Sequence, residues 1–235
     1  MVIALKISKI GKIIKIHSII YLKLFFELTL NMLLNLLYPF QIAGQSMLNY
    51  YSMRQINKYQ TLALSRNFVS SIHATGAVIL SGLALTNGFE PETVYAAQIW
   101  SCGYFLYDSI CMLRYDKHGL MRSAYLYHHL ASIYVLQFDP AKYYGLHAIF
   151  WGELSNLPSY LVYHNLKTNP RNSQLVLYKN IQKYMYGFIR LPVVGYYLWK
   201  AYFGNPIGER TPVLAVIPVY LMGIIWSYKL LMGKK

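Results

Sequence analysis

Two adjacent histidines, His128 and His129, lie in the run YLYHHLASIYV, which is apolar enough to sit inside a lipid bilayer. A structural hydrogen bond between helices needs only one imidazole, so the pair favours a chemical role. Asp108, in GYFLYDSI, and Glu153, in GELSNLPSY, are carboxylates in neighbouring apolar runs. Histidine can act as a general base at an acyl group, and a carboxylate can orient it. These four residues are the candidate catalytic groups.

Further polar residues lie in the same apolar runs. An ionisable group at membrane depth costs at least ~2.5–3.5 kcal/mol on insertion scales and usually marks a functional site. Helical spacing places several of these residues on faces shared with the candidate catalytic groups. Tyrosine or arginine can hold an oxyanion, and arginine can also hold a phosphate. The candidate substrate-binding residues are His73, Tyr104, Tyr125, Ser132, Asn156, Tyr160 and Arg190.

Structural interpretations of the same residues stay open. His73 can simply hydrogen-bond between helices, and Asp108 or Glu153 can be the ion-pair partner of Arg190. No metal site and no bound cofactor are expected, because the histidines lack the H-x-x-x-H, H-x-x-H-H and H-E-x-x-H spacings of known centres. A haem or metal site built from the span histidines and Glu153 remains an alternative.

Composition indicates the elements that position these groups. The chain has 235 residues, of which 56% are hydrophobic and only 13% are charged, and its mean hydropathy is +0.30. Soluble domains usually carry about 25% charged residues. The net charge of +14 is concentrated between the apolar runs, which is typical of membrane topology, so nucleic acid is not expected as a partner. The sequence predicts an all-α membrane protein.

About seven apolar segments approach the ~20 residues that a helix needs to cross the hydrocarbon core. They cover residues 18–40, 68–86, 94–113, 122–138, 142–164, 180–203 and 211–231. The connections 41–67, 114–122 and 165–179 and the C-terminal tail are basic, which by the positive-inside rule places the C-terminus in the cytosol. The first segment carries a polar stripe, so it is either a true span or an in-plane amphipathic helix.

The order of the motifs resembles the TLC-domain family, the lipid-handling membrane fold of ceramide synthases and translocating-chain-associating membrane proteins. SRNFVSSIHATG is followed by GYFLYDSI, the HH pair with LASIY, GELSNLPSY, and an arginine before a proline in the next span. The resemblance covers roughly residues 60–231. It implies a bundle of about six helices around a lipid-accessible polar cavity, usually preceded by one extra span.

In the ceramide synthase branch, the resemblance implies transfer of a fatty acyl group from acyl-CoA to a sphingoid amine. His128 and His129 match the histidine pair of that branch. The later HDxSD stretch of that branch corresponds here to GELSN, so Gly152 replaces histidine, and Glu153 and Asn156 replace the aspartates. The sequence is closer to the small TLC-domain proteins that lack the full synthase motif and adjust membrane lipid composition.

The expected organisation is a basic N-terminal segment with the first span and its connection at residues 1–59, a TLC domain at 60–231 and a short basic tail at 232–235. The expected function is lipid metabolism or homeostasis in the endoplasmic reticulum membrane, as an acyltransferase with acyl-CoA as co-substrate and a sphingoid or phospholipid acceptor. Membrane lipids and fatty acyl chains are the expected partners, and a homodimer is one compatible assembly. The alternatives are a non-catalytic lipid-binding, lipid-sensing or cargo-escort protein, or a lipid transporter.

Overall fold

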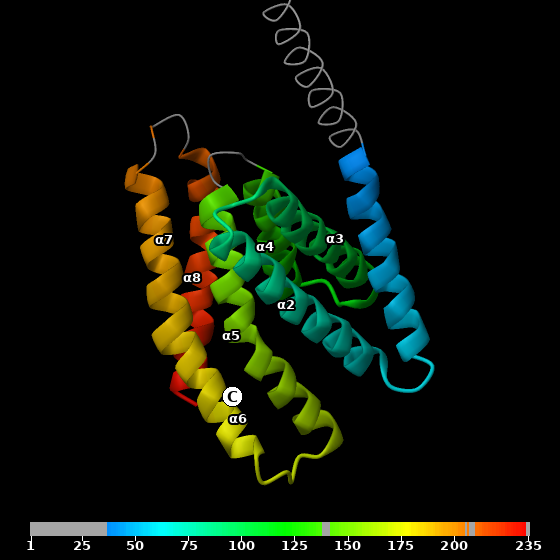
Figure 1. Cartoon of the computed structure of the whole chain (residues 1–235). Helices are drawn as coiled ribbons and strands as arrows, with labels where there is room; N and C mark the ends of the chain where they lie inside the picture. Colours follow the sequence, from blue (N-terminus) through cyan, green and yellow to red (C-terminus); the bar gives the residue numbers. More distant parts are fainter. Residues whose placement is uncertain (1–36, 138–141, 205, 207–209, 234–235) are drawn as a thin grey trace, which may run out of the picture. The chain divides into compact units, whose positions relative to one another are not determined.

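The computed structural model describes residues 37–137, 142–204, 206 and 210–233 (Figure 1). Most of the first apolar segment, 18–40, lies outside the described residues, and so does the choice between a span and an in-plane helix. The chain divides into two compact units, Met1–Gln41 and Ile42–Lys235, and the candidate site belongs to the second.

The described residues are helical, and no strand occurs among them, which confirms the all-α fold. A helix over residues 37–56 comes first. The helices that follow are α2 (Leu62–Thr86), α3 (Pro91–Tyr115), α4 (Leu120–Gln137), α5 (Lys142–Thr168), α6 (Leu175–Tyr184), a π-helical turn (Met185–Arg190), α7 (Leu191–Gly204) and α8 (Thr211–Leu231).

Local chemistry explains where α2 and α3 begin and end. The Thr61 side chain caps α2 by accepting a hydrogen bond from the backbone N–H of Leu64. After α2, Gly88 adopts a positive φ of 68°, a conformation that glycine reaches without steric cost. Pro91 then occupies the first turn of α3, where its missing N–H has no helical partner to lose.

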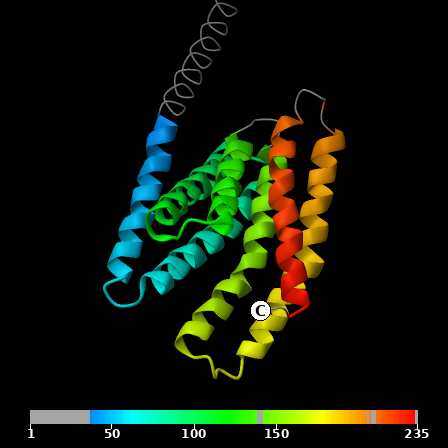
Figure 2. The ribbon, with the colours of Figure 1, turned by 180° about the vertical axis from the view of Figure 1, so that it is seen from behind.

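The helices pack as a closed ring. α2 contacts α3 and α5, α4 contacts α3 and α8, and α7 contacts α5 and α8, so each helix meets its neighbour around the bundle. Figures 1 and 2 show α7 and α8 side by side, with α6 and the π-helical turn continuing into α7. This arrangement turns one face of each helix toward a shared interior.

The helix over 37–56 fills most of the segment that the sequence suggested as a connection, 41–67. Its packing against α3 explains the difference. Gly103 leaves room for Gln45, whose Cβ lies 2.6 Å from where a glycine-to-alanine methyl would stand. The Tyr50 and Tyr115 hydroxyls are 3.3 Å apart, and Met53 is fully buried. Of the basic residues that indicated a connection, Arg54 lies on this helix, Lys58 in the turn that follows it and Arg66 on α2.

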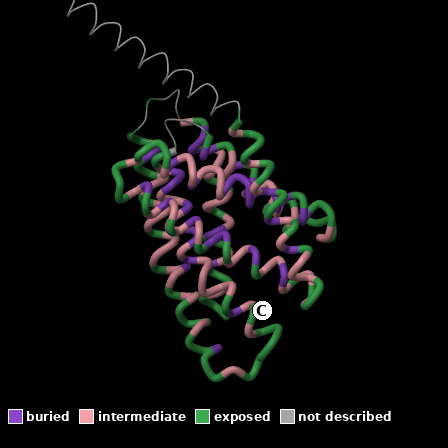
Figure 3. Tube along the Cα trace, turned by 45° about the vertical axis from the view of Figure 1, so that its right-hand side comes forward, coloured by how far each residue is buried: buried purple, intermediate pink, exposed green. Residues whose placement is uncertain are grey.

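Large apolar side chains face outward on several helices. On α2, Phe68, Ile72, Ile79 and Leu83 form one exposed stripe, while the buried face carries small or polar residues such as Ser65, Ser81 and three alanines. α8 likewise exposes leucine and isoleucine side chains along its length. Figure 3 shows buried residues as short interrupted patches between exposed and intermediate ones. Soluble monomers rarely expose apolar surface this continuously.

Two of the described helices, α2 and α8, are long and apolar enough to cross a membrane. The remaining long helices are interrupted by polar residues. In α3, for example, Glu92, Asp108 and Arg114 lie within a single helix. Of these three residues, Glu92 and Arg114 are exposed, and Asp108 is on the face of α3 that lines the interior.

Gly76 provides a test of the α2–α3 packing. A Cβ at this position would lie 2.5 Å from the Trp100 ring, and the Trp100 indole N–H donates to the His73 carbonyl at 2.9 Å. Gly76→Ala should therefore displace the indole and lower the free energy of unfolding by about 1–3 kcal/mol. Gly44→Ala is the control, because nothing lies within 4 Å of that Cβ. Chemical unfolding in detergent measures both, and equal stability of the two variants would contradict this packing.

Candidate functional site

A polar chamber of about 500 Å³ lies inside the ring. The helices α2, α3, α4, α5, α6 and α8 and the π-helical turn all contribute to its wall. Every candidate residue named from the sequence lines this chamber except Ser132 and His73. The lining candidates are Tyr104, Asp108, Tyr125, His128, His129, Glu153, Asn156, Tyr160 and Arg190. Residues from four separate apolar runs of the sequence therefore meet at one site.

His129 is the imidazole with the most defined surroundings. Its Nε2 lies 3.8 Å from Asp108 Oδ2, and its Nδ1 lies 3.4 Å from Ser109 Oγ. The Ser109 hydroxyl donates to the Phe105 carbonyl at 2.7 Å, so its oxygen is left to accept from His129 Nδ1–H. In this tautomer Nε2 is free to take a proton, and the imidazolium that forms faces a carboxylate.

Arg66 holds Asp108 in place. Its guanidinium lies 3.2 Å from Asp108 Oδ1 and 2.6 Å from Asp116 Oδ1. One arginine on α2 thus ties together two carboxylates at the C-terminal part of α3. Asp108 Oδ2, the oxygen nearest His129, is the one that Arg66 does not bind in this structure. The arrangement is a chain of charged groups that runs from Asp116 to the imidazole.

Glu153 forms a second carboxylate–imidazole pair. Its Oε1 lies 3.9 Å from His73 Nε2, and its Oε2 accepts a hydrogen bond from Asn156 Nδ2 at 3.1 Å. His73 is behind the chamber wall, stacked on the Tyr104 ring at 3.8 Å between centroids. The Tyr104 hydroxyl donates to Ser70 Oγ at 2.7 Å. His73 therefore packs against the site and does not line it.

Arg190 points into the chamber from the π-helical turn. Its Nη1 donates to Asn156 Oδ1 at 2.8 Å, and the Tyr186 hydroxyl hydrogen-bonds to the same oxygen. The guanidinium carbon also lies 4.9 Å from the centre of the Tyr186 ring. The wide turn has a local cause, because Pro192 cannot donate to the carbonyl four residues back and its ring would crowd that carbonyl. Among the described residues, Arg190 has no ion pair with a carboxylate.

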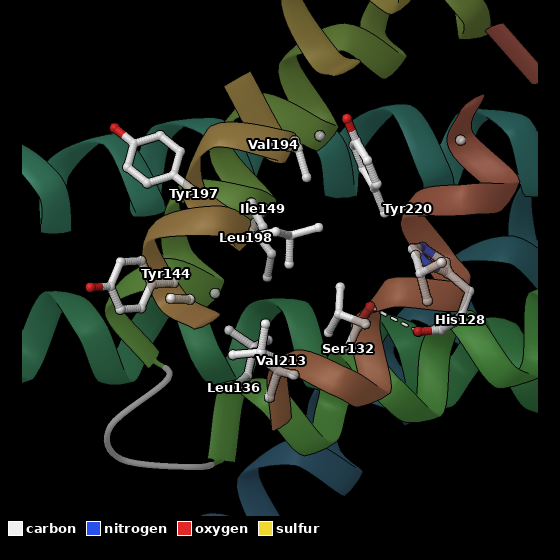
Figure 4. Close-up of a pocket in the computed structure, with 18 of the residues that line it drawn as sticks. His128, Ser132, Leu136, Tyr144, Ile149, Val194, Tyr197, Leu198, Val213 and Tyr220 are labelled. Atoms are coloured by element: carbon white, nitrogen blue, oxygen red, sulfur yellow. Dashed lines mark hydrogen bonds between the residues drawn. The ribbon is translucent and has the colours of Figure 1, made fainter. Parts of the chain in front are cut away.

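His128 occupies the boundary between the chamber and a second cavity. This cavity is lined mainly by apolar side chains of α4, α5, α7 and α8, and Figure 4 shows Leu136, Val194, Leu198 and Val213 around it, with His128 at one end. Ser132 lines the apolar cavity and donates to the His128 carbonyl at 2.8 Å. His128 Nδ1 is buried without a hydrogen-bond partner among the described residues.

The two cavities share their lining at one point. Phe105, His128, Glu153 and Arg190 line both of them. An amphiphilic molecule could therefore place an apolar chain among the side chains of Figure 4 and a polar head in the chamber. Its polar-to-apolar junction would lie beside an imidazole, a carboxylate and a guanidinium.

Several site residues were not identified from the sequence. Arg66 was assigned to a basic connection, although Arg66, Ser70 and His73 follow the spacing of one helix face. Gln182 precedes Tyr186 and Arg190 at similar intervals and donates to Ser159 Oγ at 3.0 Å. The chamber residues that were not among the candidates are Ser70, Phe105, Ser159, Gln182, Tyr186, Trp226, Lys229 and Leu230.

Within the described part of the chain, no group of three or more His, Cys, Asp or Glu residues is arranged to hold a metal ion. Comparison with known proteins gives no match to a family model, a curated protein or a solved structure.

Proposed function

We propose that this chain is a multi-pass membrane protein of lipid metabolism that resembles the TLC-domain proteins, located in the endoplasmic reticulum membrane with its C-terminus in the cytosol. The outward apolar stripe of α2 and the exposed apolar length of α8 support a lipid-facing surface. The inward polar faces support an interior site reached by lipids. The ordered motifs between residues 60 and 231 support the family and, through it, the location.

Acyl transfer is the function that the site supports best, and the observation that carries it is the shared lining of the two cavities. A fatty acyl chain would occupy the apolar cavity, with its carbonyl carbon at the junction near His128 and Arg190. The acceptor hydroxyl or amine would enter through the polar chamber. This geometry holds donor and acceptor together at a place lined by groups capable of acid–base chemistry.

In this reaction the acceptor oxygen or nitrogen attacks the acyl carbonyl of an acyl-CoA thioester. His129 Nε2 takes the acceptor's proton, and Asp108 stabilises the imidazolium. Arg190 stabilises the negative charge on the carbonyl oxygen as the tetrahedral intermediate forms. Collapse of this intermediate breaks the carbon–sulfur bond, and the proton held by His129 passes to the departing thiolate, which leaves a new ester or amide and free CoA thiol.

Lipid profiling of cells tests this proposal. Cells producing wild type, a His128→Ala/His129→Ala double variant or an empty vector are compared at matched protein levels. Acyl transfer predicts that wild type changes the acyl composition of one lipid class and that the double variant loses this change. Equal changes with both proteins, or no change with wild type, would count against acyl transfer.

A non-catalytic lipid-binding or escort function is the second candidate, and the distances in the chamber favour it. The two carboxylate–imidazole separations, 3.8 Å for Asp108–His129 and 3.9 Å for Glu153–His73, exceed hydrogen-bond length. Arg190 also donates a hydrogen bond to Asn156, so part of its hydrogen-bonding capacity is already used within the protein. A protein of this class would co-purify with a lipid bound, and purified protein given acyl-CoA and acceptor would show no turnover.

Ala148 offers a test of the apolar cavity as the acyl-chain site. It lines that cavity from α5, in the stretch of sequence between Gly145 and Gly152, which also line it. Ala148→Phe should fill this volume, so the longest acyl chains in the product should fall by about tenfold or more relative to shorter ones. Ala148→Gly is the matched control that leaves the cavity open. Mass spectrometry of the acylated product measures the distribution, and an unchanged distribution would place the chain elsewhere.

A further inference from the structure

A third cavity, of about 870 Å³, lies on the other side of α3 from the polar chamber. The helix over 37–56 forms one wall of this groove and α3 forms the other. The helices run in the same direction here, because Gln45 meets Gly103 and, further along both, Tyr50 meets Tyr115. Arg54 and Arg114 therefore lie toward the same end of the groove.

The charged residues of this groove are all cationic. Arg54, Lys58 and Arg114 line it, and no lining residue is acidic. Lys58 donates to Gln55 Oε1 at 2.6 Å, and Arg114 lies 5.6 Å from the Tyr115 ring centre. None of the three forms an ion pair with a carboxylate of the described residues. The positive charge at this end of the groove is thus available to an anion.

The rest of the lining is uncharged, and it mixes polar residues with exposed apolar side chains. Met47 and Ile110 are exposed along it, and they lie about 10 Å and about 6 Å along their helices from Arg54 and Arg114, respectively. The groove therefore combines cations at one end with exposed apolar side chains further along.

We propose that this groove binds an anionic phospholipid, with the phosphate held by Arg54, Lys58 and Arg114 and an acyl chain lying along Met47 and Ile110. A phospholipid carries its charge and its chain in the same order as the groove presents cations and apolar surface, and basic pockets between spans bind anionic headgroups in this way. The site rests on the membrane location proposed above, but it is separate from the chamber and needs no catalysis.

Native mass spectrometry of the full-length protein in detergent tests the site with phosphatidylglycerol and phosphatidylcholine of matched acyl chains. Wild type should prefer phosphatidylglycerol by about tenfold or more. The Arg54→Gln/Lys58→Gln/Arg114→Gln variant should lose this preference. The charge-matched control Lys167→Gln/Arg171→Gln/Lys179→Gln, which changes three exposed residues on and after α5, should keep it.

Equal binding of the two lipids by wild type, or an unchanged preference in the groove variant, would overturn the proposal. Competition by millimolar inorganic phosphate that abolishes lipid binding would also overturn it, because the site would then recognise free phosphate. If the triple variant fails to fold, Arg54→Gln and Arg114→Gln are tested singly, since both side chains are exposed. Carbonate extraction of membranes reports on membrane integration separately, and turnover by chamber variants reports on catalysis.

Discussion

His129→Gln is expected to reduce acyl transfer by about 10²–10⁴-fold, which is the usual contribution of a positioned general base. The amide can still hydrogen-bond to Ser109, which lies 3.4 Å from His129 Nδ1, but it cannot take a proton from the acceptor. Lipid binding should change little, because His129 lines the polar chamber and not the apolar cavity. The measurement is single-turnover transfer by purified protein, with bound lipid quantified in the same sample.

His164→Gln is the control for this variant, since His164 is exposed on α5 and absent from both cavities. It should transfer acyl groups at the wild-type rate. A His129→Gln protein that keeps its thermal unfolding midpoint and also keeps turnover within about threefold would remove His129 from the mechanism. His128→Gln would then become the remaining test of a histidine base.

Arg66→Met is expected to lower the free energy of unfolding by about 2–3 kcal/mol. Removing one partner of a fully buried ion pair costs about 3–5 kcal/mol, because the other charge is left without compensation. Here the loss should be smaller, because the side chains of Arg66, Asp108 and Asp116 are 19%, 14% and 39% exposed. Without the guanidinium, the two carboxylates lose the cation they share. Chemical unfolding in detergent measures the change.

Two further variants separate charge from packing. Arg171→Met, on the exposed connection between α5 and α6, should leave stability unchanged. Adding Asp108→Asn to Arg66→Met should recover part of the loss, since an amide at position 108 needs no cation. If the single and double variants unfold at the same denaturant concentration as wild type, the ion-pair chain contributes nothing to stability.

Helical spacing was sufficient to find most of the chamber. Tyr104 and Asp108 are four residues apart on α3. Glu153, Asn156 and Tyr160 follow one face of α5. The helical spacing alone therefore placed each group on one face of its helix. The sequence could not show that these faces meet, because the order of the helices around the ring depends on how they pack. The structure supplies this order through the contacts of α4 with both α3 and α8.

The residues that were missed share a physical cause. Arg66 and Lys229 lie near helix ends, where a cation is usually a membrane-interface anchor. From their charge alone, they were therefore interpreted as markers of membrane topology and not as site residues. Ser132 was expected beside the histidines in a binding role. It lines the apolar cavity instead, and its hydroxyl donates a hydrogen bond to the His128 carbonyl. His73 has the spacing of a lining residue, but the Tyr104 ring stands between it and the chamber. Such differences depend on how side chains pack, and the helical spacing of residues in the sequence contains no information about packing.

The π-helical turn at Met185–Arg190 decides which side chains of this stretch share a face. Gln182 and Arg190 are eight residues apart, which in an unbroken α-helix would separate them by about 80° around the axis. A π turn accommodates one residue more than an α turn over nearly the same rise. The two residues therefore lie as if they were seven residues apart, within about 20° of each other, and both face the chamber. A substitution that let this stretch close into ordinary α-helix at its present length would turn one of the two side chains away from the chamber.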